Sequence, residues 1–282
     1  MSGLFQYFTQ GTEHTKTGAT IGCEIETHLV NENGHPISVE VTRKLLALTP
    51  PGQMVVTNDL GRQLIELAIC PHESPESLME STYIGLAWLY REAARFGARP
   101  LFQPILNSND DLLYIADARD QIWVDLDGKP ALEQICRVAS IQFTVSVSPN
   151  DAIGAINRLW TSGLHELDYP NSEHWQAYFG LTRSKYDLNR FAGPDHFTDL
   201  EDYITQLSKQ PVIMLNGKAC QLPVESIAGD HESIDLFLRS VWWHYRLRRY
   251  GNSLCIEARP FARRDDASIA NIWGQIAKVI EI

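Results

Sequence analysis

The sequence predicts an α+β fold in which helices pack against a largely antiparallel sheet. Its strand-like segments alternate apolar and polar residues and are rich in β-branched side chains, as in 19–30 and 137–149. Helix-like segments such as 74–98 do not alternate strictly with these strands, which argues against a doubly wound parallel sheet. No change in composition marks a linker, so we expect one domain over 1–282.

Local signals predict the individual elements in order. A short amphipathic helix is expected at 3–11. The helix at 74–98 has Ser74 as its N-cap and Pro75 in its first turn. The polar, aromatic and irregular segment 170–200 is expected to form an active-site loop. Further strands are expected at 60–71, 98–106 and 252–261, and further helices at 150–160, 198–209, 231–242 and 265–282.

Composition and charge narrow the function classes. The 282 residues are 44% hydrophobic and 21% charged, which is typical of a globular chain and excludes a disordered one. The formal charge of −11 argues against nucleic acid as a partner, because phosphate backbones require a basic surface. Neither a signal peptide nor an apolar run of about 18 residues is found, so we expect no membrane partner. The five cysteines form no CxxC pair, which argues against a zinc site and fits a reduced, cytoplasmic protein.

Polar or charged side chains interrupt four of the apolar strands, where an ordinary core strand has aliphatic residues. Positions two apart on a strand point to the same face and lie roughly 6.5–7 Å apart. Buried carboxylates would repel one another and rise in pKa unless a positive group were close. Hard divalent cations such as Mg²⁺ relieve this repulsion and share substrate phosphates, so the pattern favours a metal–phosphate site. The residues are Glu24 and Glu26, Glu66, Gln142 and Thr144, and Glu257 and Arg259.

The same charged residues also have an ordinary interpretation. A single glutamate in an apolar strand is more often an edge or outward-facing residue, so Glu24 and Glu26 could form the solvated face of an amphipathic strand. We interpret the run RLRR at 246–249 as a solvated charge cluster. The alternative is a contact between Arg246 or Arg248 and ATP phosphates.

Histidines and tryptophans have simpler interpretations. His28 falls on the same strand face as the two N-terminal glutamates and is interpreted as an ordinary polar residue at the rim of a site. His244 is interpreted as a helix-surface or structural group. Four tryptophans are interpreted as aromatics that pack in the core or in loops. They are Trp160, Trp175, Trp242 and Trp243.

Five motifs follow one another along nearly the whole chain. They are YFTQG with IGCEIE, TNDLGRQLIELAICP, RVASIQFTV, TDLEDYITQLSKQPVIM and SIDLFLRSVWWHYRLRRYGNSLCIEARP. In this order they resemble the glutamate–cysteine ligase superfamily, whose catalytic fold is that of glutamine synthetase. The resemblance implies that the antiparallel sheet belongs to a glutamine-synthetase-like catalytic fold.

The resemblance also implies an ATP-dependent carboxylate–amine ligase. Such enzymes use ATP and Mg²⁺ or Mn²⁺ to phosphorylate the γ-carboxylate of glutamate, and an amino-acid amine then attacks the acyl phosphate. The partners would be small molecules: ATP as co-substrate, glutamate or a similar carboxylate, and an amine.

The implied roles fall on the polar strand residues and on one aspartate beside them. Arg259 would stabilise the transferred phosphate. Catalytic roles are implied for Arg259, Glu66 and Glu257, nucleotide contacts for Gln142, Thr144 and Arg246, and metal ligation for Glu24, Glu26, Asp59, Glu66, Gln142 and Glu257.

The chain also departs from the family pattern. Thr144 stands where the family often has asparagine, Ser146 stands near a usual aspartate, and the region after residue 150 is short. These departures leave the acceptor amine open and support an alternative, a non-catalytic relative that binds nucleotide or amino acid as a regulator. A phosphotransferase for guanidino compounds on the related fold fits less well, because the sequence has no obvious reactive cysteine motif.

Overall fold

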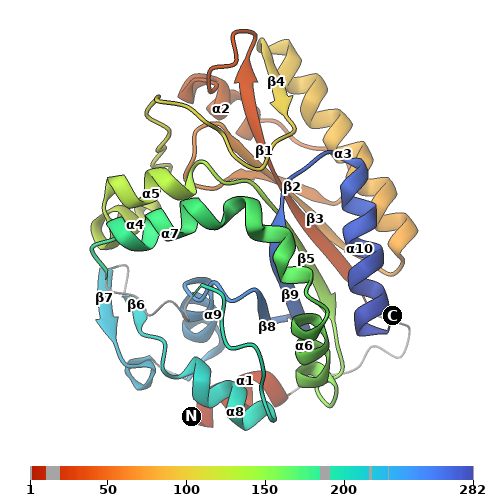
Figure 1. The fold of residues 1–282 in the computed structure, drawn as a ribbon, viewed down its shortest axis with the longest axis vertical. Helices are drawn as coiled ribbons and strands as arrows, with labels where there is room; N and C mark the ends of the chain where they lie inside the picture. The colour runs from red at the N-terminus through yellow and green to blue at the C-terminus, as the bar shows by residue number, and fades with distance from the viewer. Residues whose placement is uncertain (1, 11–19, 185–190, 216–217, 228, 282) are drawn as a thin grey trace.

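A seven-stranded antiparallel sheet forms the centre of the computed structural model (Figure 1). Its strand order is β2-β3-β1-β5-β9-β8, and β4 also pairs with β1, so the predicted α+β class is confirmed. The strands are β1 (Ile21–Asn31), β2 (Met54–Asn58), β3 (Leu64–His72), β4 (Ala98–Leu101), β5 (Ser140–Ser146), β8 (Tyr245–Tyr250) and β9 (Ser253–Ala262). The structure describes residues 2–10, 20–184, 191–215, 218–227 and 229–281.

One face of the sheet is apolar and packs against two long helices, α3 (Pro75–Arg95) and α10 (Ala267–Ile280). Because side chains alternate along a strand, Leu67 of β3 and Phe143 of β5 both point into this core. Gly85 of α3 allows the close approach, since a Cβ there would lie 2.6 Å from Leu67 Cδ2. The alternate positions of the same strands therefore face the other side.

Short helices and a two-stranded ribbon cover the opposite face of the sheet (Figure 1). They enclose the side of the sheet to which the polar residues point. These elements are α4 (Ala118–Asp127), α5 (Lys129–Ile135), the 3₁₀ helix η1 (Leu164–Asn171), α7 (Ser172–Leu181), the ribbon β6 (Val212–Leu215) with β7 (Lys218–Leu222), and α9 (His231–Arg239).

The remaining helices pack at several places around the sheet. The first helix packs against β8 and α9, and the Tyr7 hydroxyl accepts a hydrogen bond of 3.1 Å from the Arg249 backbone N–H. These helices are α1 (Ser2–Thr9), α2 (Val39–Leu46), α6 (Ala152–Thr161), α8 (Leu200–Leu207) and η3 (Val224–Ser226). Along the described residues, no helix combines the length and the apolar character that crossing a membrane requires.

Several element predictions were wrong or incomplete. The segment 170–200 was predicted to be irregular, yet η1 and α7 make it helical as far as Leu181; residues 185–190 lie outside the described residues. The strand predicted at 98–106 ends at Leu101. Strand β2 and helices α2, α4 and α5 were not predicted, because they are short and their stability depends on tertiary packing.

Candidate active site

The register of the sheet brings most of the predicted site residues into one row across its polar face. Strand β1 lies between β3 and β5, and β9 lies between β5 and β8, so each polar position meets another on the neighbouring strand. The register pairs Glu26 with Glu66, Glu24 with Gln142, Thr144 with Glu257, and Glu257 with Arg246. The row is acidic on β1 and β3 and basic on β8 and β9.

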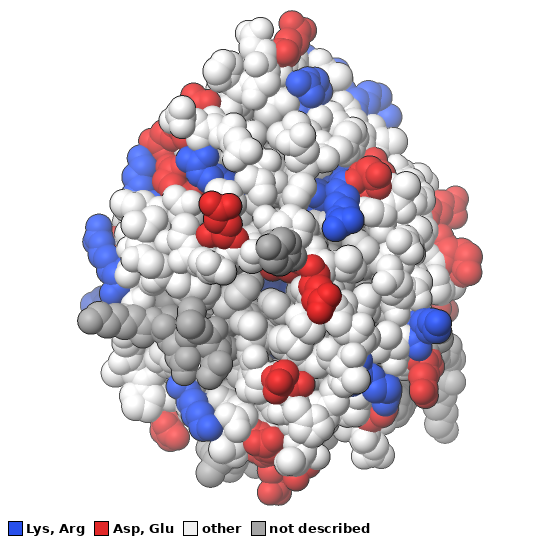
Figure 2. All heavy atoms as spheres, in the orientation of Figure 1, with Lys and Arg blue, Asp and Glu red and all other residues white. Residues whose placement is uncertain are grey.

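A cavity of about 470 Å³ opens on this polar face. Among the predicted site residues, Thr144 and Glu257 do not line the cavity. The others do, and they are Glu24, Glu26, Asp59, Glu66, Gln142, Arg246 and Arg259. On the face shown in Figure 2, acidic and basic side chains are interspersed, with no broad basic patch among the described residues.

Glu24, Glu26, Asp59 and Glu66 form what we call the acidic half of the cavity. Glu26 is buried, and its Oε2 accepts two hydrogen bonds of 2.7 Å, from the backbone N–H and the hydroxyl of Ser140. Glu24 and Glu66 are half-buried and form no ion pair with the described residues. The acidic half therefore contains more carboxyl groups than nearby cations.

Burial and mutual repulsion raise the pKa of three of these carboxyl groups. Burial, followed by the charge of Asp59, raises the pKa of Glu26 to about 8, despite the hydrogen bonds from Ser140. Burial and then the neighbouring carboxylates raise the pKa of Glu66 well above its usual value, and burial also raises that of Glu24. A bound cation would reverse these shifts.

Gln142 completes a set of oxygen donors that suits a divalent cation. The side chain is 8% exposed, and its Oε1 has no hydrogen-bond partner among the described residues. Carboxylate and amide oxygens are the ligands that Mg²⁺ and Mn²⁺ prefer. The donor chemistry therefore fits the metal ion that the resemblance implies. In the part of the chain that the structure describes, however, no three His, Cys, Asp or Glu side chains already form a metal-binding group.

Three arginines surround Glu257 and form the basic half of the cavity. Glu257 Oε2 accepts a hydrogen bond of 2.8 Å from Arg246 Nε and lies 3.7 Å from Arg259 Nη1. Its Oε1 accepts hydrogen bonds from Arg248 Nη1, at 3.3 Å, and from the Tyr250 hydroxyl. Burial alone would raise the pKa of Glu257, but the arginines outweigh it and lower the pKa to about 2. Glu257 therefore holds the arginines together, and its role as a metal ligand stays a prediction.

The interpretation of RLRR as a solvated cluster was wrong. The run lies in β8, where Leu247 packs into the core while Arg246 and Arg248 face the polar side. Arg246 is 2% exposed and also donates hydrogen bonds to the carbonyl oxygens of Leu238 and Val241. Its guanidinium is directed at protein acceptors, so it would supply positive charge to a phosphate more readily than hydrogen bonds. Its predicted nucleotide contact stays a prediction.

The prediction that His28 lies at the rim of the site was also wrong. The side chain is fully buried, not at a rim, and its Nε2 lies 3.0 Å from the carbonyl oxygen of Arg137. Burial lowers the pKa of His28 to about 4, so the ring is neutral near pH 7. His28 therefore packs beneath the loop that carries Arg137 and does not line the cavity.

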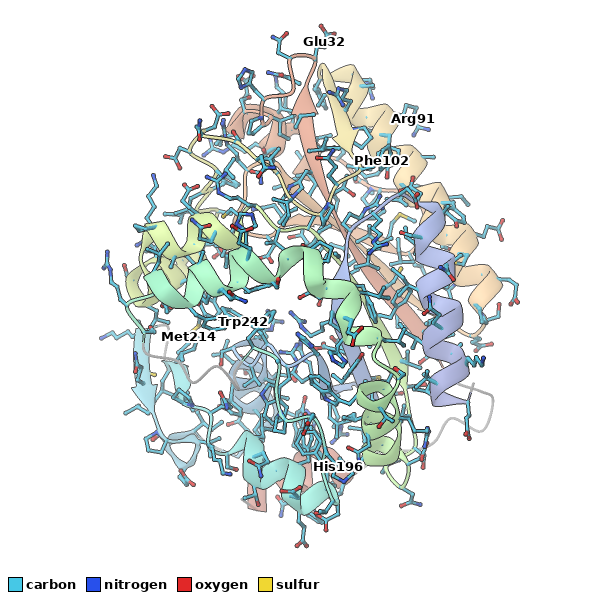
Figure 3. The ribbon with its side chains drawn as sticks, viewed as in Figure 1. Glu32, Arg91, Phe102, His196, Met214 and Trp242 are labelled. Atoms are coloured by element: carbon cyan, nitrogen blue, oxygen red, sulfur yellow. The ribbon has the colours of Figure 1, made fainter. Side chains whose placement is uncertain are left out.

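Aromatic side chains from the covering elements form another wall of the cavity. Trp175 of α7 lies with its ring centroid 4.2 Å from that of Phe191, and Trp123 of α4 lies 5.1 Å from Trp242. All four line the cavity, and Trp242 is labelled beside Met214, another lining residue, in Figure 3. The interpretation of Trp175 and Trp242 as packing aromatics was therefore incomplete, because the sequence around a tryptophan does not indicate whether its ring faces the core or a cavity.

His244 is a cavity residue whose position the sequence did not reveal. Helix α9 ends at Arg239, so His244 lies outside it, 9% exposed and stacked on Trp160 at 5.4 Å. Burial, followed by the nearby His165, lowers its pKa to about 3. Both ring nitrogens lack hydrogen-bond partners among the described residues. A neutral imidazole in this position can donate or accept one hydrogen bond to a ligand.

Comparisons with known proteins give structural neighbours only. No protein-family model matches the sequence, and no curated protein matches it significantly. The chain is similar to a glutamate–cysteine ligase from Francisella tularensis in complex with AMP, at 10% identity and a TM-score of 0.48. It is also similar to a bifunctional glutathione synthetase from Pasteurella multocida, at 12% and 0.41, and to a glutamine synthase homologue, at 8% and 0.41.

The coverage of these neighbours is unequal. The alignments include 95%, 100% and 99% of this chain, but only 67%, 43% and 57% of the respective neighbours. The neighbours include the ligase type that the sequence motifs resemble.

Proposed function

We propose that this chain is an ATP-dependent carboxylate–amine ligase, which activates a carboxylate as an acyl phosphate and joins it to an amine. The observation that supports this best is the division of one cavity into an acidic half and a basic half. Mg·ATP carries the two charges that such a cavity requires, a divalent cation for carboxylates and phosphate oxygens for guanidinium groups.

The two halves would have separate tasks in phosphoryl transfer. Glu24, Glu26 and Glu66 would hold Mg²⁺ or Mn²⁺ together with the free oxygen of Gln142. The bound metal supplies charge neutralisation on the phosphates. Arg259 has the most exposed side chain of the three arginines, at 25%, and would face the transferred phosphoryl group.

The donor and the setting are part of the proposal. Glutamate, activated at its γ-carboxylate, is the donor that the sequence resemblance favours. Its carboxylate and the transferred phosphate of ATP would meet where the acidic and basic halves join. The five cysteines are unpaired, which supports a reducing, cytoplasmic setting.

A non-catalytic relative that binds nucleotide or amino acid is the second candidate. It is favoured by Thr144 and Glu257, because these two residues of the implied site do not line the cavity and Glu257 is already occupied by protein arginines. Such a protein would bind Mg·ATP without turning it over.

Release of ADP separates the two candidates. The assay uses Mg·ATP with a matrix of acidic donors against amino-acid and polyamine acceptors. If the protein is a ligase, ADP release requires the metal and one donor–acceptor pair. The substitution Glu66→Gln should then abolish this release. Glu32→Gln, on the exposed turn after β1, is the matched control and keeps the activity. No release with any pair, while Mg·ATP still raises the melting temperature, would favour the binding protein.

A further inference from the structure

Asp168 and Asn171 form a buried polar pair in the same cavity, outside both halves. They lie on η1, which packs against β9, and both line the cavity. Asn171 is fully buried and Asp168 is 8% exposed. Asn171 Nδ2 donates a hydrogen bond of 2.7 Å to Asp168 Oδ1, which fixes the direction of the amide. The metal and phosphate chemistry proposed above uses neither residue.

The pair presents acceptor oxygens and lacks a cation. Asn171 Oδ1 is buried without a hydrogen-bond partner among the described residues. Asp168 forms no ion pair with them, and burial raises its pKa to about 7 even though Asn171 donates to it. A buried acceptor left unpaired is costly, so the pair is suited to a ligand that brings hydrogen-bond donors and positive charge.

The surroundings of the pair favour an organic cation over a metal ion. The polar pair offers one carboxylate and one amide oxygen, fewer donors than a dedicated divalent site requires. Trp175 follows η1 on α7, and its ring packs against that of Phe191; both rings line the cavity. Aromatic faces attract ammonium groups and also pack against the apolar stem that carries them.

We infer that Asp168 and Asn171 bind the ammonium group of the acceptor substrate, a primary amine on an apolar stem that packs against Trp175 and Phe191. This inference rests on the proposed function, in which an amine is the acceptor substrate.

The chemistry of the pair suits the step that follows binding. The ammonium gives one proton to the Asp168 carboxylate, which leaves a neutral amine with a lone pair. That lone pair forms the bond to the acyl carbon, while the bond from that carbon to the phosphate oxygen breaks and its electron pair leaves with phosphate. After the bond has formed, the nitrogen carries one proton more than an amide, and this proton passes to solvent or to the released phosphate.

The variant Asp168→Asn tests the inference, because it removes the charge and keeps the shape. The KM of the amine should rise about 10- to 100-fold, the range expected for losing a hydrogen bond between charged groups. The KM of ATP should change less than about twofold. Hydroxylamine is largely neutral at pH 7 and needs no ammonium site. The rate of hydroxamate formation should therefore stay within about twofold of the wild-type rate.

Two further variants keep the test decisive if Asp168→Asn folds poorly. Glu166→Gln, also on η1 but exposed, is the matched control and should leave every constant unchanged. Trp175→Leu should reduce the preference for amines with long apolar stems over methylamine.

The possible outcomes separate the inference from the proposed function. An unchanged amine KM in Asp168→Asn, or an equal loss with hydroxylamine, would overturn the inference while the ligase activity of the wild type stands. If the wild-type protein forms neither ADP with any pair nor hydroxamate, the proposed function fails and the inference fails with it.

Discussion

Two buried glutamates on the same sheet face have opposite electrostatic states. Glu26, in the acidic half, is 5% exposed and has a pKa raised to about 8, whereas Glu257, in the basic half, is 4% exposed and has a pKa lowered to about 2. The two glutamates are buried to nearly the same extent, so their neighbouring groups determine the difference between their pKa values. Glu26 has hydrogen-bond donors from Ser140 and other carboxylates nearby, while Glu257 has three guanidinium groups.

This difference shows what each half of the cavity can bind. The basic half is already organised around its carboxylate, so its remaining positive charge is available to an anion. The acidic half is under-neutralised and gains most from a cation. A ligand that carries both a metal ion and phosphates would satisfy both halves together.

Glu257→Gln is expected to give the largest effect. It leaves three guanidinium groups close together without their counter-charge, and breaking a buried ion pair in this way costs about 3–5 kcal/mol of unfolding free energy. Denaturant titration of the variant against wild type measures the loss. A loss below about 1 kcal/mol would contradict the role of Glu257 in holding the arginines together.

Glu66→Gln should have the opposite effect on stability. It relieves repulsion among the carboxyl groups of the acidic half, so the metal-free variant should be as stable as wild type or more stable. If Glu66 binds the metal as proposed, activity should fall at least about 100-fold, because the substitution removes a charged oxygen ligand. Steady-state ADP release and thermal melting measure the two effects. A variant that loses stability and keeps its activity would show that the acidic half is merely structural.

The pH dependence of stability should also differ between the halves. A carboxyl group whose pKa is raised on folding stabilises the protein below its usual pKa of 4.5, and Glu26 loses that contribution as the pH rises to about 8. Glu257 contributes above pH 4.5 and loses its contribution as the pH falls toward 2. Each group contributes a slope of at most about 1.4 kcal/mol per pH unit.

Above pH 6.5 a buried histidine such as His28 is mostly neutral both folded and unfolded, and the groups that lose stabilising contributions include Glu26 and the buried Asp168, whose pKa burial raises to about 7. Between pH 6.5 and 8 the unfolding free energy of the metal-free protein should fall, and Glu26→Gln should make this fall shallower. Denaturant midpoints measured across the window test this. A fall of equal slope in the variant would assign the effect to other groups.

Tyr250→Phe should give the smallest effect. It removes one hydrogen bond to Glu257 and leaves the three arginines in place, so the expected loss is about 1 kcal/mol. Denaturant midpoints of the variant and wild type measure it. A loss as large as that of Glu257→Gln would mean that the hydroxyl, and not the arginines, holds the carboxylate.

The sequence predicted the face of each polar residue but not its neighbours. The spacing of Glu24 and Glu26 indicates one face of one strand, whereas their pairing with Gln142 and Glu66 depends on a register that no local pattern encodes. The prediction that these strands contribute to one site came from the motif resemblance and not from the spacing of the residues.

What the sequence could not predict depends on tertiary contacts. The basic run around Arg246 predicts a solvated side chain. In the structure, alternation along β8 buries it beside Glu257, which is eleven residues further along the chain. Asp168 lies in a polar segment with Pro170, and only the packing of η1 against β9 places it in the cavity. The site roles of such residues can be recognised only when the positions of the sheet and of its covering helices are both known.

Calorimetric titration of ATP, with Mg²⁺ and with a chelator, tests most directly whether the two halves bind one metal–phosphate ligand. We expect tight binding with Mg²⁺ and much weaker binding with the chelator. Glu24→Gln combined with Glu66→Gln should remove this metal dependence, while Glu32→Gln should keep it. Equal affinity for ATP with and without the metal, or a metal dependence that survives in the double variant, would contradict the account.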